Sequence, residues 1–248
     1  MILTFIINLK KDIERKQYVL DLLKPYEDLL TSKVIDAVEG KLLSQEDLNK
    51  QFDVSYAYRR YGHFLNAGEI GCTLSHFKCY RELVNSEDNF ACIFEDDITL
   101  MHNLNILDSL RSCVDVEKPV ILLLSGDYWY NKRYRDGNPS VMSVYDAVGS
   151  YAYLINKAAA KCILQKNPRA CNVADSWAYY KSLGINIYAV YPYVVDANIE
   201  NFKSSIEQTV FGENRRNMSL ILMLKAYWLA LNKKILLKRG HFVSKIRK

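Results

Sequence analysis

Three consecutive acidic residues, Glu95, Asp96 and Asp97, directly follow the short apolar run at residues 90–94. This run has the length and composition of a strand buried on both faces, and open α/β sheets bind ligands at the carboxyl ends of such strands. Adjacent carboxylates repel one another, so a cation or several hydrogen-bond donors are expected to neutralise them. Hard oxygen ligands suit Mg²⁺ or Mn²⁺, which can bridge to a diphosphate. The pattern predicts a divalent-metal site; the alternative is one acid that caps a turn beside two solvated ones.

A predicted helix over residues 68–83 carries a second set of reactive side chains. Gly71 and Ser75 are four residues apart and share one face, while Cys72 and His76 share the neighbouring face. Small residues allow a helix to approach a sheet or a ligand closely, so Ser75 or His76 could contact a diphosphate or a ribose. The alternative for His76 is a packing role, as is common for a single histidine on a helix.

The elements that position these residues follow from hydrophobic periodicity. Apolar runs predict strands at residues 2–9, 33–38, 90–94, 120–124, 148–155 and 185–195. Helices are expected at residues 12–24, 68–83, 156–166 and 175–183, with a further helix start at residue 44. Residues 56–66 are expected to be irregular, and residues 128–140 to form a long exposed loop. Strands that alternate with helices predict an α/β fold with an open, largely parallel sheet and helices on both faces.

The net charge of +5 is unevenly distributed along the chain. Residues 214–248 contain ten Lys or Arg and no Asp or Glu, which leaves 23 basic residues against 28 acidic ones in residues 1–213. We therefore expect a main domain at 1–213 and a basic, partly apolar tail at 214–248 that docks on an anionic membrane. The apolar run at 218–231 is too short to span a bilayer. Six cysteines without a CxxC pair favour a reduced, cytosolic protein, and the absence of a recognition motif argues against nucleic acid as a partner.

Two motifs in this order resemble glycosyltransferase family 25, which includes lipooligosaccharide galactosyltransferases and the collagen galactosyltransferase domains. They are GEIGCTLSHFKCYRELV at residues 68–84 and CIFEDDITL at residues 92–100. Three further stretches are similar to the family and occur in the same order: the opening FIINLKKDIERK and the later VGSYAYLINKAAAK and VADSW. The resemblance covers roughly residues 1–210. It implies a GT-A-like fold, an inverting reaction and a UDP-sugar donor, often UDP-galactose.

The resemblance also implies roles for individual residues. Asp97 would be the direct ligand of Mn²⁺ or Mg²⁺, and Glu95 a further metal ligand or a contact to the ribose or uracil. Arg15 would pair with phosphate oxygens or hold its loop, the alternative being a surface ion pair with Asp12 or Glu14. The residues expected at the nucleotide-sugar are Asn8, Leu9, Arg15, Asp36, Ala37, Ser75, His76, Glu95 and Asp96.

Asp175 matches the late aspartate of the family and would be the catalytic base, which takes the proton of the attacking acceptor hydroxyl. The alternative is that Asp175 only N-caps the following helix. Trp177, Tyr128 and Trp129 are candidates for stacking on an acceptor sugar, and His241 is a candidate further metal ligand.

These features together predict an inverting, divalent-metal-dependent transferase that moves a hexose, with galactose preferred, from a UDP-sugar to a lipooligosaccharide or LPS core acceptor. The enzyme would be cytoplasmic and peripheral on the inner face of a bacterial inner membrane, with a lipid-linked oligosaccharide as acceptor. The alternatives are a glucosyltransferase of the same family, or a membrane- or glycan-binding module without catalysis. A metal phosphohydrolase would need further Asp or His ligands for a second metal, and the sequence holds no second dense cluster.

Overall fold

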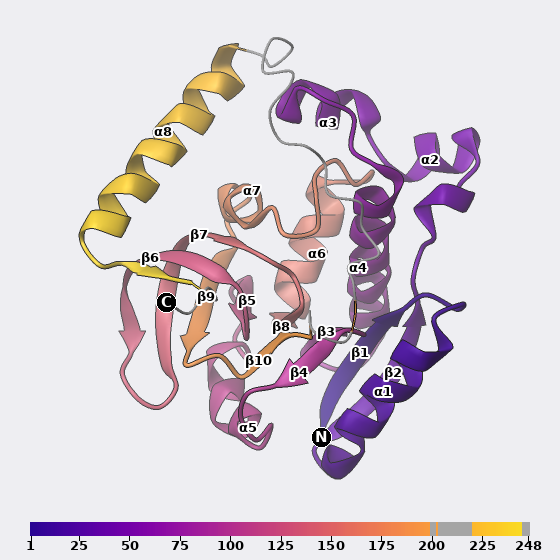
Figure 1. Ribbon diagram of the computed structural model, residues 1–248, viewed down its shortest axis with the longest axis vertical. Coiled ribbons are helices and arrows are strands. Elements are labelled where there is room, and N and C mark those ends of the chain that lie inside the picture. The colour runs from indigo at the N-terminus through magenta and orange to yellow at the C-terminus, as the bar shows by residue number, and fades with distance from the viewer. Residues whose placement is uncertain (199–201, 203–219, 245–248) are drawn as a thin grey trace.

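The computed structural model describes residues 1–198, 202 and 220–244 of the 248-residue chain. Within these residues, nine strands form one sheet in the order β11-β6-β7-β9-β5-β8-β3-β1-β2 (Figure 1). These strands are β1 (Ile2–Asn8), β2 (Leu30–Asp36), β3 (Phe90–Glu95), β5 (Val120–Leu123), β6 (Asp127–Arg135), β7 (Ser140–Val148), β8 (Ala152–Asn156), β9 (Asn186–Tyr191) and β11 (Phe242–Val243). Two short strands, β4 (Ile98–Leu100) and β10 (Val195–Ala197), pair separately.

The open α/β sheet is confirmed, but its strand pairing is mixed rather than largely parallel. Strand β1 is parallel to β2 and β3, and β5 is parallel to β9. The other pairs in this sheet are antiparallel. Neighbouring parallel strands need a crossover connection, usually a helix. Strands β6, β7 and β8 follow one another in the chain without a helix, so the helix-alternation rule does not hold for this half of the sheet.

Helices cover both faces of the sheet, as expected. Ile121 and Leu123 of β5 pack into a cluster with α4 (Ala67–Asn85), α6 (Lys157–Lys166) and α7 (Trp177–Ser182). The alternate residues Val120 and Leu122 pack into a second cluster with α1 (Ile13–Leu23) and α5 (Ile106–Leu110). Burial of one such aliphatic side chain contributes about 1.5–3 kcal/mol. Burial of both faces explains why the strands read as continuous apolar runs.

Several segments differ from the expected structure. The strand expected at 148–155 is interrupted, because β7 ends at Val148 and β8 starts only at Ala152, and the strand expected at 185–195 ends at Tyr191. Helix α3 (Val54–Tyr61), which follows α2 (Gln45–Gln51), occupies much of the segment at 56–66. The Asp53 side chain accepts a hydrogen bond from the Tyr56 backbone N–H at the start of α3, and Gly62 ends the helix with a φ of 78°. The expected loop at 128–140 is instead the β6–β7 hairpin, since its run of aromatic residues favours strand structure.

Helix α4 is held close to the carboxyl ends of β1 and β2. Asn66 and Glu69 form a reciprocal capping box at its start. A Cβ added at Gly71 would lie 2.4 Å from the Val38 carbonyl oxygen, so only glycine allows this approach. The Ser75 hydroxyl accepts a hydrogen bond from the Val38 N–H at 2.8 Å and donates to the Gly71 carbonyl at 2.7 Å. Helix α4 is therefore fixed against the loop that follows β2. Three short 3₁₀ segments complete the fold: η1 (Lys24–Tyr26), η2 (Gly40–Leu42) and η3 (Arg111–Cys113).

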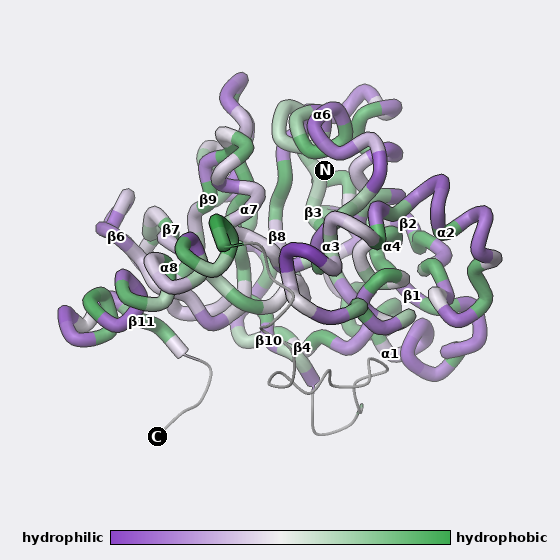
Figure 2. Tube along the Cα trace, turned by 90° about the horizontal axis from the view of Figure 1, so that it is seen from above, coloured by the Kyte–Doolittle hydropathy of each residue, from purple (hydrophilic) through white to green (hydrophobic). Residues whose placement is uncertain are grey.

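Helix α8 (Leu220–Lys238) runs along the edge of the sheet beside β6 (Figure 1). Of its residues only Leu236 is buried, and Figure 2 shows hydrophobic colours along its first part. Lys233 pairs with the buried Asp146 of β7 and lies over the Trp129 ring. Strand β11 then pairs with β6, so the basic C-terminal segment contributes a strand to the main sheet. The expected boundary between residues 213 and 214 lies outside the described residues. In the described part of the chain, no helix is long and apolar enough to cross a bilayer.

Candidate active site

A cleft of about 580 Å³ lies at the carboxyl ends of β1, β2 and β3. This volume is within the range of small-ligand sites, about 300–1,000 Å³. The turn between β7 and β8 and the segment before α7 complete its wall. Of the candidate residues from the sequence, the structure brings together nine in this cleft: Leu9, Arg15, Ala37, Ser75, His76, Glu95, Asp96, Asp97 and Asp175. These residues, which the sequence analysis assigned to different roles, therefore line one cleft.

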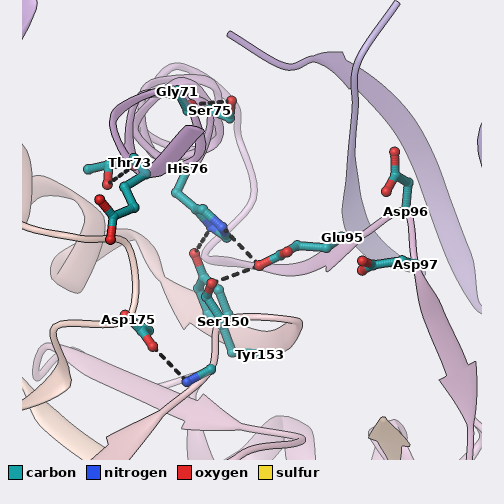
Figure 3. Close-up of polar contacts among 12 residues, drawn as sticks. Gly71, Thr73, Ser75, His76, Glu95, Asp96, Asp97, Ser150, Tyr153 and Asp175 are labelled. Carbon is teal, nitrogen blue, oxygen red and sulfur yellow. Dashed lines mark hydrogen bonds and ion pairs between the residues drawn. The ribbon is translucent and has the colours of Figure 1, made fainter. Parts of the chain in front are cut away.

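The three adjacent acids at the end of β3 point to different partners. The Glu95 carboxylate accepts a hydrogen bond from the Ser150 hydroxyl at 2.7 Å, and its Oε1 lies 3.4 Å from His76 Nε2. Asp96 accepts a hydrogen bond from the Asn8 side-chain amide at 2.7 Å. Figure 3 shows Glu95 directed toward His76 and Ser150, away from Asp96. The sequence predicted that Glu95 and Asp96 bind the sugar nucleotide together. In the structure the Glu95 carboxylate is held apart from Asp96.

Arg15 is the positive partner of the other two acids. Its guanidinium lies 3.1 Å from Asp96 Oδ1 and also pairs with Asp97. It further stacks on the Phe202 ring, 5.4 Å from the ring centroid. The alternative of a surface pair with Asp12 or Glu14 is wrong, because the Arg15 side chain is largely buried and directed to the acid cluster.

Burial and like charge act on the protonation of these acids. Burial, with the Glu95 charge adding to it, raises the pKa of Asp97 to about 6, although Arg15 opposes the shift. Burial also raises the pKa of Asp96. For Glu95, burial acts upward on the pKa, but the neighbouring His76 and the Ser150 hydrogen bond outweigh it and the pKa is lowered. Within the part of the chain that the structure describes, the buried Asp97 Oδ1 has no hydrogen-bond partner. Buried carboxylate oxygens without sufficient donors fit a hard divalent cation such as Mn²⁺ or Mg²⁺.

Two nucleotide candidates at the strand ends do not line the cleft. Asn8 is buried, and its amide donates to Asp96 and to the Asp12 carbonyl at 3.0 Å. It therefore orients the acid cluster rather than contacting a ligand. Asp36 is exposed at the end of β2 and forms an ion pair with Lys10 at 3.0 Å. The carboxylate of Asp36 therefore lies on the solvent side of the strand end. The next residue, Ala37, lines the cleft.

His76 belongs to a buried chain of polar side chains. Its Nδ1 is 2.7 Å from the Tyr153 hydroxyl, which is 2.9 Å from the Tyr80 hydroxyl. The Ser75 hydroxyl is committed to the helix and to the Val38 N–H, as described above. Ser75 thus shapes the cleft wall, whereas the Nε2 edge of His76 faces Glu95.

Asp175 is not the N-cap of α7. The helix starts after Ser176, and Asp175 instead accepts a hydrogen bond from the Gly149 N–H at 2.8 Å. Burial raises the pKa of Asp175, with the Gly149 hydrogen bond opposing the shift. A carboxylate with a raised pKa at the cleft wall is suited to accept a proton near neutral pH.

Gly149 and Ser150 are site residues that the sequence analysis did not single out. Gly149 has a φ of 97°, in the region that glycine favours, and a Cβ there would meet the Tyr151 ring at 2.7 Å. Its N–H and carbonyl are bound by Asp175 and by the Trp177 indole, and the next residue binds Glu95. The signal was the Gly-Ser pair within the VGSYAYL motif, just before a strand.

The acceptor candidates are corrected by the structure. Trp177 is 1% exposed with its indole N–H donated to the Gly149 carbonyl, so its ring cannot stack on a sugar. Tyr128 is fully buried and donates to the Val190 carbonyl. Trp129 packs its ring against Phe242 and Lys233 at the sheet edge. His241 stacks on Tyr130 and does not line the cleft, so it is not a ligand of a metal held there.

Comparison with known proteins identifies the family. Residues 1–176 match glycosyltransferase family 25 (LPS biosynthesis protein), and the chain belongs to this family. Human procollagen galactosyltransferase 2 is 27% identical over 176 residues, which cover 66% of this chain and 27% of that protein. The probable inactive glycosyltransferase 25 family member 3 of Bos taurus is 28% identical over 176 residues, covering 66% of this chain and 29% of that protein. The chain thus spans less than a third of the length of these curated relatives.

Among solved structures, the glycosyltransferase GlyE of Streptococcus pneumoniae TIGR4 is similar with a TM-score of 0.42 and 9% identity. The match covers 99% of this chain and 65% of that one. The inositol-1-phosphate CTP transferase of T. maritima has a TM-score of 0.43 at 10% identity, over 94% of this chain and 96% of that one.

We predict that Asp97→Asn raises the free energy of unfolding of the metal-free protein at neutral pH. The raised pKa of Asp97, about 6, means that the folded protein binds the proton more tightly than the unfolded chain, whose aspartate pKa is about 4. Stability therefore falls as pH rises from about 4 to about 6. Above this window the ionised carboxylate destabilises the native state by about 1–3 kcal/mol, and asparagine removes this penalty.

Urea unfolding in EDTA at about pH 7.5 and at about pH 5 measures the effect, since the difference between the two proteins should shrink at the lower pH. Asp88→Asn, at an exposed position, serves as the control and should leave stability unchanged. A less stable Asp97→Asn protein at the higher pH would show that the Arg15 ion pair outweighs the burial of charge.

Proposed function

We propose that this family 25 chain transfers a hexose, with galactose preferred to glucose, from a UDP-sugar to a lipooligosaccharide or LPS core acceptor with inversion. The observation that carries the proposal is the convergence of Asp96, Asp97 and Asp175 in one cleft at the strand ends of a chain that belongs to a glycosyltransferase family. The galactose preference follows from the name of the human relative, procollagen galactosyltransferase 2.

Asp97 is the proposed primary ligand of a divalent cation, Mn²⁺ or Mg²⁺, with Asp96 beside it. Support comes from the buried Asp97 Oδ1, which has no hydrogen-bond partner among the residues described. Glu95, the other expected ligand, has its carboxylate engaged by Ser150 and His76 and would need to turn to join this ion. A bound divalent ion would neutralise the charge that develops on the departing diphosphate. Leu9 and Ala37 would border the nucleoside, and Arg15, which lines the same cleft, would meet a phosphate oxygen.

Asp175 is the proposed base. The acceptor hydroxyl oxygen forms a bond to the anomeric carbon while the bond from that carbon to the UDP oxygen breaks, and the hydroxyl proton passes to the Asp175 carboxylate. The hydrogen bond from Gly149 fixes one carboxylate oxygen, which leaves the other for the proton. The raised pKa of Asp175 supports this role, because a base is most effective when its pKa approaches the working pH.

We also propose that the enzyme works on the inner face of a bacterial inner membrane, where α8 docks on the anionic surface. Leu224 and Trp228 on α8 are 61% and 60% exposed. Large exposed apolar side chains in a row are unfavourable in water, and an apolar helix with flanking cations can lie in a lipid interface. Lys225, next to Leu224, is exposed, as are Lys234, Lys238 and Arg239 at and after the C-terminal end of the helix, whereas Lys233 is held by Asp146. The further cations at 245–248 lie outside the described residues.

Turnover in the presence of Mn²⁺ tests the transferase and its metal. Release of UDP from UDP-galactose should require both Mn²⁺ and an acceptor, should stop in EDTA, and should be slower from UDP-glucose. Asp97→Asn should abolish the Mn²⁺-dependent turnover without loss of folding. Activity that persists in EDTA and in this variant would overturn the metal role, and binding of the acceptor without UDP release would favour a non-catalytic module.

For the base, Asp175→Asn should lower the rate of transfer by at least about 10²-fold while the Kd for UDP-sugar stays unchanged. Asparagine keeps an oxygen that can accept the Gly149 hydrogen bond, so the turn should remain in place. Ser182→Ala, at an exposed position in α7, is the matched control. Near-normal turnover per folded molecule in Asp175→Asn would remove the assignment.

Vesicle sedimentation tests the docking surface. The full chain should bind vesicles with anionic lipid and be released by high salt, since each near-surface cation contributes about 1 kcal/mol. The double variant Leu224→Glu and Trp228→Glu should weaken binding, and Ile13→Glu, at an exposed position on α1, should not. Point variants are preferable to truncation, because truncation would also remove β11 from the sheet. Equal binding by the double variant would contradict the proposal.

A further inference from the structure

One polar cluster in the cleft has no role in the proposed transfer. The Cys72 thiol, the His76 imidazole and the Glu95 carboxylate offer a sulfur, a nitrogen and an oxygen atom that all lie within 4.8 Å of one another. Cys72 and His76 are four residues apart on α4, so their side chains are neighbours on one helix face. Glu95 reaches the same point from the end of β3, and all three residues line the cleft.

His76 is presented as a metal-binding imidazole would be. Its side chain is 1% exposed, and among the described residues its Nε2 has no hydrogen-bond partner, the Glu95 oxygen being 3.4 Å away. Its other ring nitrogen is held by the Tyr153 hydroxyl at 2.7 Å, and Tyr80 holds Tyr153 in turn. In metal sites the second ring nitrogen of a histidine ligand is normally held in this way. The Ser150 hydroxyl orients the Glu95 carboxylate by the same principle.

We propose that Cys72, His76 and Glu95 form a second cation site that takes a thiophilic divalent ion of the Zn²⁺ type. Zinc binds sulfur, nitrogen and oxygen ligands at about 2.0–2.3 Å, so two ligands of one ion are separated by at most about 4.5 Å. The three atoms, all within 4.8 Å of one another, are close to this spacing. Three protein ligands leave a fourth position open on a four-coordinate ion.

The donor atoms separate this site from the one at Asp97. Mn²⁺ and Mg²⁺ prefer oxygen ligands, whereas a thiolate with an imidazole selects Zn²⁺ or a related ion. Occupation of the second site holds Glu95 on the zinc side and places a second divalent charge in the cleft that Asp97 also lines. Zinc is therefore expected to inhibit the Mn²⁺-dependent transfer at concentrations at which it occupies the Cys72 site.

Cobalt is the probe, because Co²⁺ replaces Zn²⁺ and reports its ligands by absorption. The metal-free full-length protein titrated with Co²⁺ should show a thiolate-to-cobalt charge-transfer band and the strong visible bands of a four-coordinate ion, and added Zn²⁺ should remove both. Cys72→Ser should abolish the charge-transfer band. Cys113→Ser, a part-exposed cysteine in η3 that does not line the cleft, should leave it unchanged. Asp97→Asn should also retain the band, which separates this site from the proposed transferase metal.

His76→Gln and Glu95→Gln provide a second measurement should Cys72→Ser fail to fold by circular dichroism. Both keep the thiol, and each should weaken Co²⁺ binding by at least about tenfold. The proposal is overturned by weak, six-coordinate-type bands alone in the wild-type protein, by an unchanged thiolate band in Cys72→Ser, or by unchanged affinity in both other variants. None of these spectra needs a sugar donor, so failure of the transferase proposal would leave the result unaffected.

Discussion

Three adjacent carboxylates are held partly or wholly out of water at the end of β3. Side chains from the surrounding elements offset the free-energy cost of burying these like charges. Each acid has its own counterpart: Ser150 and His76 for Glu95, Asn8 for Asp96, and Arg15 for Asp96 and Asp97. Buried like charges repel strongly in a low-dielectric environment. The compensation is incomplete at Asp97, whose pKa remains raised. This residual cost is what a bound cation would relieve.

The counterparts come from elements distant in the chain, so the acid cluster depends on how closely those elements pack. Gly71 lets α4 approach the loop after β2, and this brings His76 to Glu95. On the opposite side, Gly149 is held between Asp175 and Trp177, which sets the position of Ser150. Trp177 therefore contributes to the site through the turn that it holds rather than by stacking on a sugar. An aromatic residue close to a candidate catalytic residue, as Trp177 is to Asp175, can thus act by fixing a backbone turn through a hydrogen bond.

The sequence predicted the positions of the strand ends well, because an apolar run followed by acids is a local pattern. It therefore placed Leu9, Ala37, Glu95 and Asp97 at one edge correctly. It did not predict which way side chains point, since Asn8 and Asp36, the last residues of β1 and β2, face the protein interior and the solvent, respectively. The β6–β7 hairpin was missed because its aromatic and basic residues resemble an exposed loop in composition. Their pairing as strands depends on β9 and β11, which come much later in the chain.

The charge of the cleft bears on the order in which ligands can bind. Its lining contains three basic side chains, Lys11, Arg15 and Lys41, against seven acidic ones, Asp12, Glu39, Glu69, Glu95, Asp96, Asp97 and Asp175. A diphosphate that approaches this surface alone meets repulsion, which the low-dielectric walls of a cleft strengthen. A divalent cation at Asp97 would lower this repulsion and would compete with Arg15 for the same carboxylate. Arg15 released in this way would be available to the phosphate oxygens. Arg15 would then have two successive roles. It would neutralise the carboxylates of Asp96 and Asp97 before the nucleotide binds, and the phosphates of the nucleotide once it is bound.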